Sequence, residues 1–453
     1  MIKFYNSLTK KKEILKTKEP NKIGIYLCGI TSYADAHIGH ARTFVTFDAI
    51  FRFLENQGYQ LKYVRNITDI DDKIISEAKK KSEEVFQFSS RCIASFQEDC
   101  QALRLLVPTF EVRVTQAIDT IIKYIERLLS NNAAYCGQNG DIFFSVSRLK
   151  NYGELSHRDS EAEKKIRIKS DPNKRDQDDF VLWKLTKNDQ EPSFHSPWGA
   201  GRPGWHTECV AIATKYLGAD FDFHCGGIDL KFPHHENERA QALALQSKKF
   251  AKYWLHSGHV NLKREKMSKS LGNTITIKEI LQEVSGDCLR FYLLQTHYRS
   301  PLEHTKKSLQ AAERAYKKLC SYAEDDADKK EDFQLASEVE KPFTAALSDD
   351  FNSPEAIAYL FYLGKKIRES GSKEKRELAF SIRTLGAQIG LSFQTKSHNQ
   401  SSETKKWIEK MIQERNSARE NGNWKKADEI RSYLNKNKIQ LQDGPEGTTW
   451  RQN

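Results

Sequence analysis

Ile23-Gly24-Ile25-Tyr26-Leu27 is an apolar run with the length and composition of a buried strand. A second strand is predicted from Leu61 to Val64. Between them a helix is predicted from about His40 to Gly58, because apolar residues recur there at helical spacing: Phe44, Phe47, Ile50, Phe51 and Leu54. Strand, helix and strand joined by short loops are typical of a parallel, doubly wound, Rossmann-like α/β sheet. We therefore expect ligands at the carboxyl ends of its strands.

The strand pattern stops after this first part and resumes much later. Strand–helix alternation returns between Ser196 and Leu262, so we expect an insertion to split the sheet. After Lys266 the sequence is almost wholly helical, which predicts an α-helical bundle, and the polar stretch Gln394 to Thr404 predicts a linker to a small C-terminal domain. The expected segments are 1–110 and 196–262 for the two halves of the sheet, 111–195 for the connective insertion, 263–310 for the region after the sheet, 311–393 for the bundle and 404–453 for the C-terminal domain.

The composition limits the class of protein. The chain has 453 residues, 38% of them hydrophobic and 29% charged, which predicts a soluble globular protein of about three domains. No run is long and apolar enough to cross a bilayer, and the N-terminus lacks the pattern of a secretion signal, so no membrane partner and a cytoplasmic location are expected. The net charge of +11 favours a polyanionic partner such as nucleic acid, although a lysine-rich proteome gives the same balance.

The eight cysteines are scattered through a long chain, unlike those of a small fold held by disulfides. In a reducing compartment they should be thiols. Any cysteine with a special role is therefore expected to be a metal ligand or catalytic.

Two short motifs point to phosphate chemistry. His37-Ile38-Gly39-His40 lies after the first predicted strand, where a helix N-terminus offers unpaired N–H groups and a partial positive charge to an anion. Lys266-Met267-Ser268-Lys269-Ser270 supplies ammonium groups that, with the imidazoles, can neutralise a reacting triphosphate. Each motif alone is a weak signal, since a glycine between two histidines is more often a tight turn. Together, in this order, they resemble the two signature motifs of class I aminoacyl-tRNA synthetases.

A third set of residues has the chemistry of a metal site. His234 and Glu238 are four residues apart, so on a helix that begins after Pro233 they share one face. Cys209, on a predicted helix, and Cys28, at the end of the first strand, can complete the site. Two thiolates, an imidazole and a carboxylate suit tetrahedral zinc better than calcium or magnesium.

Spacing alone leaves alternatives to this site open. Isolated cysteines are usually buried apolar residues, and the scattered spacing lacks the specificity of paired Cys-x-x-Cys motifs. Spacing also does not exclude His235 or Glu236 as ligands.

Longer segments carry a more specific resemblance. Residues 201–209 (GRPGWHTEC), 226–238 (GGIDLKFPHHENE) and 63–73 (YVRNITDIDDK) are similar to signatures of the cysteinyl-tRNA synthetase family. The similarity extends from Tyr5 to Arg451 and includes the tail 443–451 (DGPEGTTWR). The resemblance places the family's zinc ligands on the same four residues, Cys28, Cys209, His234 and Glu238.

The resemblance implies the activity of a cysteine–tRNA ligase. Such an enzyme activates L-cysteine with ATP, bound with Mg²⁺, to cysteinyl-adenylate and pyrophosphate, and transfers the aminoacyl group to the 3′ end of tRNA(Cys), releasing AMP. One zinc ion per chain would select the substrate thiolate, because zinc binds soft thiolate while a serine hydroxyl is hard and reluctant to ionise. No editing domain is then required, and a monomer is expected because bacterial members are usually monomeric.

The family pattern also implies roles for the phosphate motifs. His37 and His40 assist the phosphates of ATP, and Lys266 and Lys269 grip them from a mobile loop; both pairs are expected to be catalytic. This loop and a contact with the tRNA stem are expected within 263–310. Asp229 matches the residue that accepts hydrogen bonds from the ATP ribose.

The amino-acid pocket and the tail complete the expected site residues. Gly29, Thr68 and Trp205 are expected to bind cysteine, although simple packing explains Trp205 nearly as well. Residues 404–453 are implied to read the anticodon, with Arg431 and Trp450 as contacts, because cations bind phosphates and aromatic rings stack on unpaired bases. A solvated helix with inward-facing tryptophans is the alternative.

Two rival functions share some of these features. A ligase of the same fold that joins cysteine to a small amino-sugar is expected to be shorter and to lack the tail that here runs from Trp407 to Arg451. A non-catalytic RNA-binding protein is expected to lose the phosphate motifs, which are intact here. Three positions depart from the family pattern: Ile30 stands where proline is usual, Ser32 where valine is usual, and Cys225 in a stretch that is commonly glycine. Cys225 is best interpreted as a small buried thiol.

Overall fold

The computed structural model describes residues 1–157, 171–186, 191–245, 249–262, 265–266, 274–324, 333–393, 402–420, 423–436, 439–444 and 447–452. The chain forms two compact units, Met1–Thr395 and Lys396–Asn453. Each unit is described by itself. Among the described residues no helix is long and apolar enough to cross a membrane.

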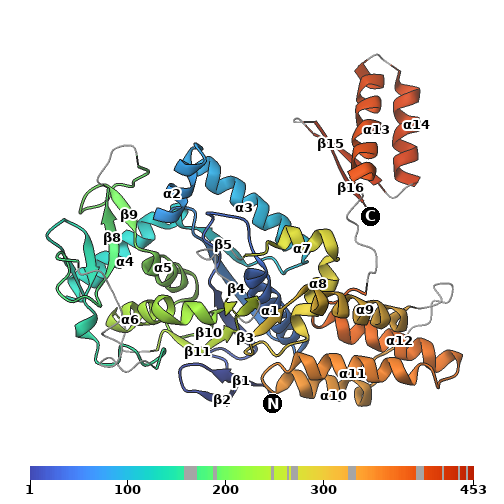
Figure 1. Ribbon diagram of the computed structural model, residues 1–453, viewed down its shortest axis with the longest axis horizontal. Coiled ribbons are helices and arrows are strands. Elements are labelled where there is room, and N and C mark those ends of the chain that lie inside the picture. Colours follow the sequence, from blue (N-terminus) through green and yellow to red (C-terminus); the bar gives the residue numbers. More distant parts are fainter. Residues whose placement is uncertain are drawn as a thin grey trace. The chain divides into compact units, whose positions relative to one another are not determined.

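A parallel five-stranded sheet with the order β11-β10-β3-β4-β5 lies at the centre of the first unit (Figure 1). Its strands are β3 (Lys22–Leu27), β4 (Gln60–Ile67), β5 (Phe110–Arg113), β10 (Phe221–Gly227) and β11 (Ala251–Ser257). Helix α1 (Ile38–Asn56) connects β3 to β4, and α6 (Glu236–Leu245) lies between β10 and β11. All four pairings are parallel, so the predicted Rossmann-like α/β class is confirmed.

The order in which the chain adds strands to this sheet changes side between β3 and β10. From β3 the chain continues outward to β4 and β5, whereas from β10 it continues the other way to β11. The neighbouring carboxyl ends of β3 and β10 therefore form the switch point at which open α/β sheets hold their ligands.

The two faces of β3 pack against different helices, because side chains alternate along a strand. Ile25 and Leu27 belong to the apolar cluster that includes α1, and Tyr26 and Cys28 belong to the cluster that includes α5 (Trp205–Leu217). Cys28, directly after β3, is thereby directed to the α5 side of the sheet.

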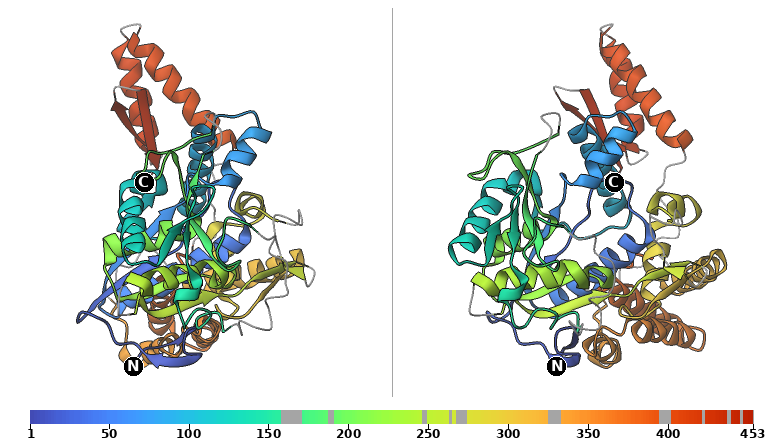
Figure 2. Two further views of the ribbon diagram at one scale, coloured as in Figure 1. Left: turned by 90° about the vertical axis from the view of Figure 1, so that its left-hand side faces the viewer. Right: turned by 60° about the vertical axis from the view of Figure 1, so that its left-hand side comes forward.

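An insertion separates the two halves of the sheet. After α2 (Asp72–Lys80) and α3 (Val85–Ala102) reach β5, the chain forms α4 (Ile118–Ser130) and an antiparallel four-stranded sheet (Figure 2). The strands of this sheet are β6 (Ala134–Cys136), β7 (Ile142–Phe144), β8 (Phe180–Leu185) and β9 (Gly201–Pro203). Strand β5 crosses the expected boundary at residue 110, since edge strands carry little local signal of which domain they join.

The remaining elements are mostly helical, as predicted. Short pairings involve β1 (Lys3–Asn6), β2 (Lys11–Ile14), β12 (Val260–Leu262), β13 (Glu265–Lys266) and β14 (Leu302–His304). The helices of the first unit after the sheet are α7 (Ile277–Glu283), α8 (Gly286–Leu294), α9 (Lys306–Ala323), α10 (Ser337–Ser348), α11 (Ser353–Lys366) and α12 (Ser372–Ala387). The second unit consists of α13 (Ser402–Glu420), α14 (Trp424–Lys436) and the hairpin β15 (Ile439–Gly444) with β16 (Gly447–Gln452).

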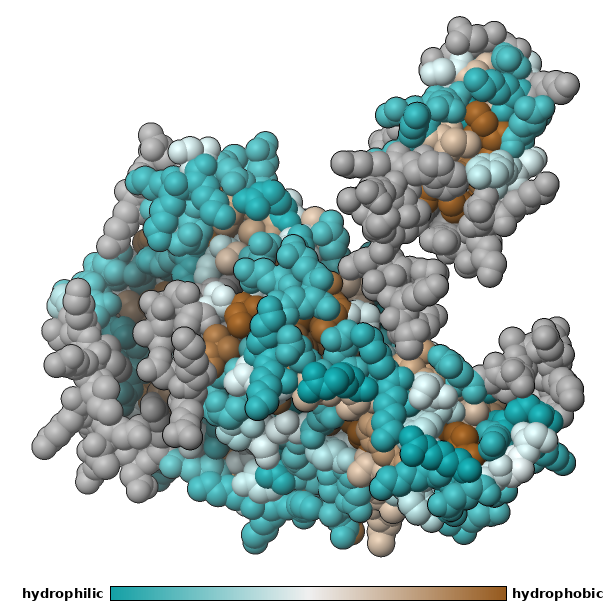
Figure 3. All heavy atoms as spheres, turned by 45° about the vertical axis from the view of Figure 1, so that its right-hand side comes forward, coloured by the Kyte–Doolittle hydropathy of each residue, from teal (hydrophilic) through white to brown (hydrophobic). Residues whose placement is uncertain are grey.

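Large apolar side chains at the surface are scattered, and the face in Figure 3 is largely hydrophilic. The exposed ones include Val107, at 88%, and Trp424, at 61%.

A buried ion pair joins α8 of the helical region to α1 of the sheet. Arg290 is fully buried; its Nη2 lies 2.5 Å from Asp48 Oδ2, and its guanidinium also donates to the carbonyls of Leu103 and Ile389. Arg52 also pairs with Asp48, through Nε at 2.8 Å, but its side chain is 25% exposed. The same carboxylate thus has one buried and one partly hydrated cationic partner.

We expect Arg290→Met to lower the free energy of unfolding by about 3 kcal/mol, because it removes a buried charge partner and the donor to two carbonyls. The matched control Arg52→Ala is expected to cost less than about 1 kcal/mol, since water can replace its contact. Urea unfolding followed by circular dichroism measures both values. Equal losses for the two variants would contradict the structural role given to Arg290.

Candidate metal centre and nucleotide site

Two thiols, an imidazole and a carboxylate meet at the switch point of the sheet. Cys28 follows β3, Cys209 lies on α5, and His234 and Glu238 lie immediately before and within α6. One ligand atom from each of the four lies within 4.8 Å of the other three. The four residues expected to bind metal are therefore brought together from three separate elements.

The separations of the donor atoms suit one tetrahedral metal ion. Cys28 Sγ lies 4.0 Å from Cys209 Sγ and 3.7 Å from Glu238 Oε1, and His234 Nε2 lies 3.0 Å from the same Oε1. Metal–sulfur bonds of about 2.3 Å in a tetrahedron place two sulfurs about 3.8 Å apart. The four side chains can thus surround a thiophilic divalent metal with little movement.

Burial favours the neutral forms of Cys28, Glu238 and His234 when no cation is present. Desolvation, followed by the neighbouring Cys209, raises the pKa of the Cys28 thiol. Desolvation also raises the pKa of Glu238 and lowers that of His234. Deprotonated ligands in such a place need a compensating positive charge, which a divalent cation supplies.

Two aromatic side chains support His234 from outside the cluster. His206 Nδ1 lies 3.0 Å from His234 Nδ1, so the ring nitrogen that faces away from the cluster has a hydrogen-bond partner. Trp205 stacks on the His234 ring with centroids 4.3 Å apart. Contacts of this kind orient ligating histidines in metalloproteins. Trp205 and His206 are half-buried and line a cleft of about 610 Å³.

The expected pocket residues Gly29 and Thr68 belong to one hydrogen-bonded chain beside the cluster. The Gly29 N–H donates to Asn66 Oδ1 (2.9 Å), and Asn66 Nδ2 donates to Thr68 Oγ1 (3.3 Å). The Thr68 hydroxyl donates to Glu208 Oε2 (2.7 Å), next to Cys209 in the chain. A side chain at position 29 has no room, since a Cβ atom there would lie 1.7 Å from the carbonyl oxygen of Asn66.

The histidine motif forms the start of α1. His37 caps this helix: its Nδ1 accepts from the His40 N–H (3.3 Å), and the His37 N–H donates to His40 Nδ1 (3.2 Å). The two rings stack, with centroids 3.8 Å apart and planes 13° from parallel. The pair therefore places two imidazoles at a helix N-terminus, where an anion is favoured.

Of the lysine motif the structure describes Lys266, and it describes the chain again from residue 274. Lys266 ends β13 and pairs with Asn261 of β12, while Lys269 lies outside the described residues. After the motif, Ile277 donates to the carbonyl of Ala36, and Ile38 donates to the carbonyl of Ile275. Residues 275–277 therefore lie directly beside the residues at the start of α1.

The remaining expected binding residues lie outside the metal-ligating cluster and the two phosphate motifs; they are Asp229, Arg431 and Trp450. Asp229 is exposed in the short turn that follows β10, at the same edge of the sheet. In the second unit Arg431 is exposed on α14, and Trp450 lies in β16 opposite Leu441. Trp424 and Tyr433 of α14 are also exposed, so aromatic and cationic side chains share this helix surface.

Several buried residues around the cluster were not among the expected site residues. Asn66 and Glu208 contact Thr68 and lie in the segments that resemble family signatures, whereas His224 and His256 lie outside those segments. Cys225 is fully buried in the apolar cluster on the α1 side, which confirms its interpretation as a small buried thiol.

The two alternative ligands that spacing left open differ in position. His235 Nε2 lies 3.3 Å from Cys28 Sγ, at the cluster. Glu236 instead accepts a hydrogen bond from the backbone of Ser156 (2.7 Å) and does not belong to a metal-ligating group among the described residues.

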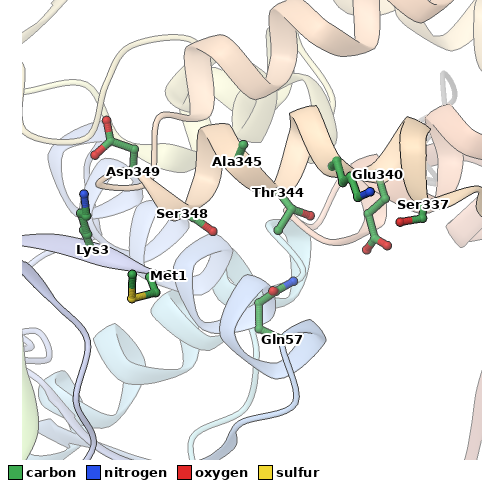
Figure 4. A pocket seen from close by; sticks show the side chains of 10 residues that line it. Met1, Lys3, Gln57, Ser337, Glu340, Thr344, Ala345, Ser348 and Asp349 are labelled. Carbon is green, nitrogen blue, oxygen red and sulfur yellow. The ribbon is translucent and has the colours of Figure 1, made fainter.

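A second cleft, of about 570 Å³, lies away from this site, between the N-terminus, α10 and the end of α1 (Figure 4). Its lining carries Glu340, Lys341 and Asp349 but no histidine or cysteine. It offers no converging ligand atoms, so the cluster at the switch point is the better candidate site.

Comparisons with known proteins show the family of the chain. Residues 14–314 match the model of the tRNA synthetases class I (C) catalytic domain, and residues 342–394 match the DALR domain. The chain is 44% identical to the cysteine–tRNA ligase of Idiomarina loihiensis over 99% of this chain and 98% of that protein. It is 45% identical to the cysteine–tRNA ligase of Coxiella burnetii (strain RSA 493) over 100% and 99%. The chain belongs to the cysteine–tRNA ligase family.

Solved structures show how widely the fold of this family is shared. Mycobacterium tuberculosis methionyl-tRNA synthetase bound by methionyl-adenylate superposes with a TM-score of 0.57 at 14% identity, over 82% of this chain and 90% of that one. The LeuRS of Agrobacterium radiobacter, in a ternary complex with tRNA and LeuAMS, gives 0.59 at 13% identity, over 84% of each chain. At these identities the likeness concerns the fold alone.

We expect Gly29→Ala to weaken binding of Co²⁺ by the cluster about tenfold or more, because the new methyl group must displace Cys28 or Asn66. The matched control is Gly24→Ala in β3, the strand that precedes Gly29, where the nearest atom to an added Cβ lies at an ordinary 3.4 Å. Titration of metal-free protein with Co²⁺ compares the two. Unchanged affinity in Gly29→Ala would show that the approach of Gly29 to Asn66 does not hold Cys28 in place.

Proposed function

We propose that this chain activates L-cysteine with ATP to cysteinyl-adenylate and transfers the cysteinyl group to the 3′ end of tRNA(Cys). The observation that carries the proposal is the convergence of Cys28, Cys209, His234 and Glu238 at the switch point of the sheet. The family and the two phosphate motifs support the reaction type, and the donor set supports cysteine as the amino acid.

Zinc is the proposed occupant of the cluster, with these four residues as its ligands. Two sulfurs, one nitrogen and one oxygen, all on residues at most 4% exposed, favour zinc over the oxygen-binding cations. When bound, zinc supplies selective affinity for a thiolate. An apolar pocket alone separates the binding free energies of near-isosteric substrates by only about 1–3 kcal/mol. The affinity of zinc for thiolate therefore distinguishes cysteine from serine.

The remaining pocket residues position the amino acid. Trp205, stacked on His234 at the edge of the cleft, covers the entrance to the cluster. Gly29 and Thr68 are held by the chain of hydrogen bonds through Asn66 to Glu208. These contacts keep the substrate carboxylate oriented toward the nucleotide, which lowers the entropic part of the barrier.

The nucleotide is proposed to lie across the start of α1. The cysteine carboxylate attacks the α-phosphorus of ATP, and the bond to pyrophosphate breaks. His37 and His40 donate to the phosphates at the helix N-terminus, and Lys266, at the end of β13, and Lys269, three residues later in the sequence, add positive charge. Asp229 accepts hydrogen bonds from the ribose, and Mg²⁺ accompanies the ATP.

The second unit is proposed to bind the anticodon of tRNA(Cys). Arg431, exposed on α14, supplies a phosphate contact, and Trp450 of β16 stacks on a base. We also propose that the protein acts as a monomer and in the cytoplasm.

Cysteine-dependent exchange between ATP and pyrophosphate tests the activation step. We expect exchange with cysteine and none measurable with serine. Lys266→Ala is expected to lower the exchange rate about 100-fold, because it removes a charge that faces the reacting phosphates, while the zinc content stays unchanged. The matched control Lys307→Ala, exposed on α9, should retain wild-type exchange. Loss of zinc together with exchange in Lys266→Ala would indicate unfolding and contradict the assigned role.

Variants in the second unit separate tRNA binding from activation. We expect Arg431→Ala and Trp450→Ala each to raise the dissociation constant for tRNA(Cys) roughly tenfold and to leave cysteine-dependent exchange unchanged. Tyr362→Ala on α11, an exposed aromatic residue of the first unit, is the control and should alter neither. Unchanged tRNA affinity in both variants would rule out these two contacts.

A further inference from the structure

A second group of metal-ligating side chains lies directly beside the first. Cys28, His224, His235 and Glu238 also bring one ligand atom each to within 4.8 Å of the other three. His235 Nε2 is 3.3 Å from Cys28 Sγ, and His224 Nε2 is 2.8 Å from Glu238 Oε2. Metal–nitrogen and metal–oxygen bonds of about 2.0 Å in a tetrahedron place a nitrogen and an oxygen about 3.3 Å apart, so His224 and Glu238 need to separate by only about 0.5 Å to share one ion.

We propose that Cys28, His224, His235 and Glu238 form an inner position for a divalent transition metal. It is distinct from the outer position formed with Cys209 and His234, and the two share Cys28 and Glu238. One thiolate, two imidazoles and one carboxylate are ligands of zinc and cobalt rather than of calcium or magnesium. The inference rests on the proposed function insofar as that function assigns zinc to the outer position.

The surroundings of His235 are those of a ligating histidine. Its Nδ1 lies 2.9 Å from His256 Nε2, and His256 Nδ1 lies 2.7 Å from Ser7 Oγ. Metal-bound histidines use the second ring nitrogen for such a contact, which fixes the ring and leaves the first nitrogen to the metal. His234 has the same arrangement with His206 in the outer position. The adjacent residues His234 and His235 each have a second histidine at Nδ1, which leaves Nε2 directed toward Cys28 and Glu238.

His224 and Glu238 complete the inner position. The His224 ring stacks on Trp254, with centroids 4.5 Å apart and planes 14° from parallel, so its orientation is fixed by packing. Its Nδ1 is buried and has no hydrogen-bond partner in the described part of the chain, and its Nε2 is directed at Glu238. Glu238 presents Oε1 to Cys28 and His234 but Oε2 to His224. One carboxylate therefore offers a separate oxygen to each position.

The two positions differ in their access to substrate. The ligands of both positions are at most 4% exposed, but the inner histidines contact the buried side chains of His256 and Trp254, which leave no route for a substrate thiol. The outer position adjoins half-buried Trp205 and His206 at the edge of the cleft. Closed four-ligand sites hold metal structurally, whereas catalytic sites keep an open side. A metal in the inner position is thus retained by the protein but does not contact cysteine.

The test titrates the metal-free full chain with Co²⁺ alone. Cys209→Ser/His234→Asn removes the outer pair of ligands, and His224→Asn/His235→Asn removes the inner pair. We expect each double variant to bind one Co²⁺ per chain. X-ray absorption should then report one sulfur ligand for Cys209→Ser/His234→Asn and two for His224→Asn/His235→Asn. The protein with all four substitutions should bind none.

The outcomes distinguish this inference from the proposed function. If Cys209→Ser/His234→Asn folds, as judged by circular dichroism, and binds no Co²⁺, the inner position is refuted and the outer one stands. If His224→Asn/His235→Asn and the wild type bind no Co²⁺ through two sulfurs, the proposed function fails instead.

A milder pair of variants serves if the double variant does not fold. Cys209→Ser removes a ligand of the outer position, so Co²⁺ then binds more tightly at the inner position. In this background, His224→Asn is expected to weaken Co²⁺ binding about tenfold or more. In the otherwise wild-type chain the same change should weaken it less than about threefold. Equal effects in the two backgrounds would overturn the proposal.

Discussion

The structure depends on holding two thiols, an imidazole and a carboxylate together where water does not reach. Cys28, Cys209, His234 and Glu238 are each at most 4% exposed. Burial shifts the pKa of Cys28 and Glu238 upward and that of His234 downward, toward the neutral forms. The thiolate of Cys28 and the carboxylate of Glu238 therefore need a bound cation, whereas the neutral imidazole of His234 is already the form that binds a metal. A cation that prefers sulfur is the chemical complement of this site.

The sheet topology is what allows these four residues to meet. The chain leaves β3 and β10 in opposite directions, so the loops beyond their carboxyl ends separate and open a crevice. Cys28 follows β3, and the turn after β10 leads to His234 and Glu238. The histidine motif at the start of α1 follows the same strand end as Cys28. The proposed thiol-binding and phosphate-binding groups thus belong to one edge of one sheet.

Features with a local cause could be predicted from the sequence. The expected strand at Ile23–Leu27 is observed as β3, Lys22–Leu27, because a buried strand is a continuous apolar run. The helix expected from about His40 begins at Ile38, since the side chain of His37 caps it, a detail that apolar spacing does not carry. The sequence also named Cys28, Cys209, His234 and Glu238, which the structure brings together, and their binding of a metal stays a prediction.

Features that arise from long-range contacts could not be predicted. His256 contacts His235 beside the cluster and is itself held by Ser7, 249 residues away in the chain, and Thr68 donates to Glu208 across 140 residues. Nothing in a strand such as β10 distinguishes His224 from a histidine that faces solvent. Spacing left His235 open as a ligand, and only the turn at Lys231–His235, with Phe232 in an extended conformation, directs it to Cys28 as well.

The zinc X-ray absorption spectrum of the full chain shows whether the substrate thiolate binds the metal. It is recorded without amino acid, with cysteine and with serine. We expect cysteine to raise the number of sulfur ligands by one above the two from Cys28 and Cys209, and serine to leave it unchanged. A spectrum that cysteine does not alter would contradict selection of the substrate through its thiolate.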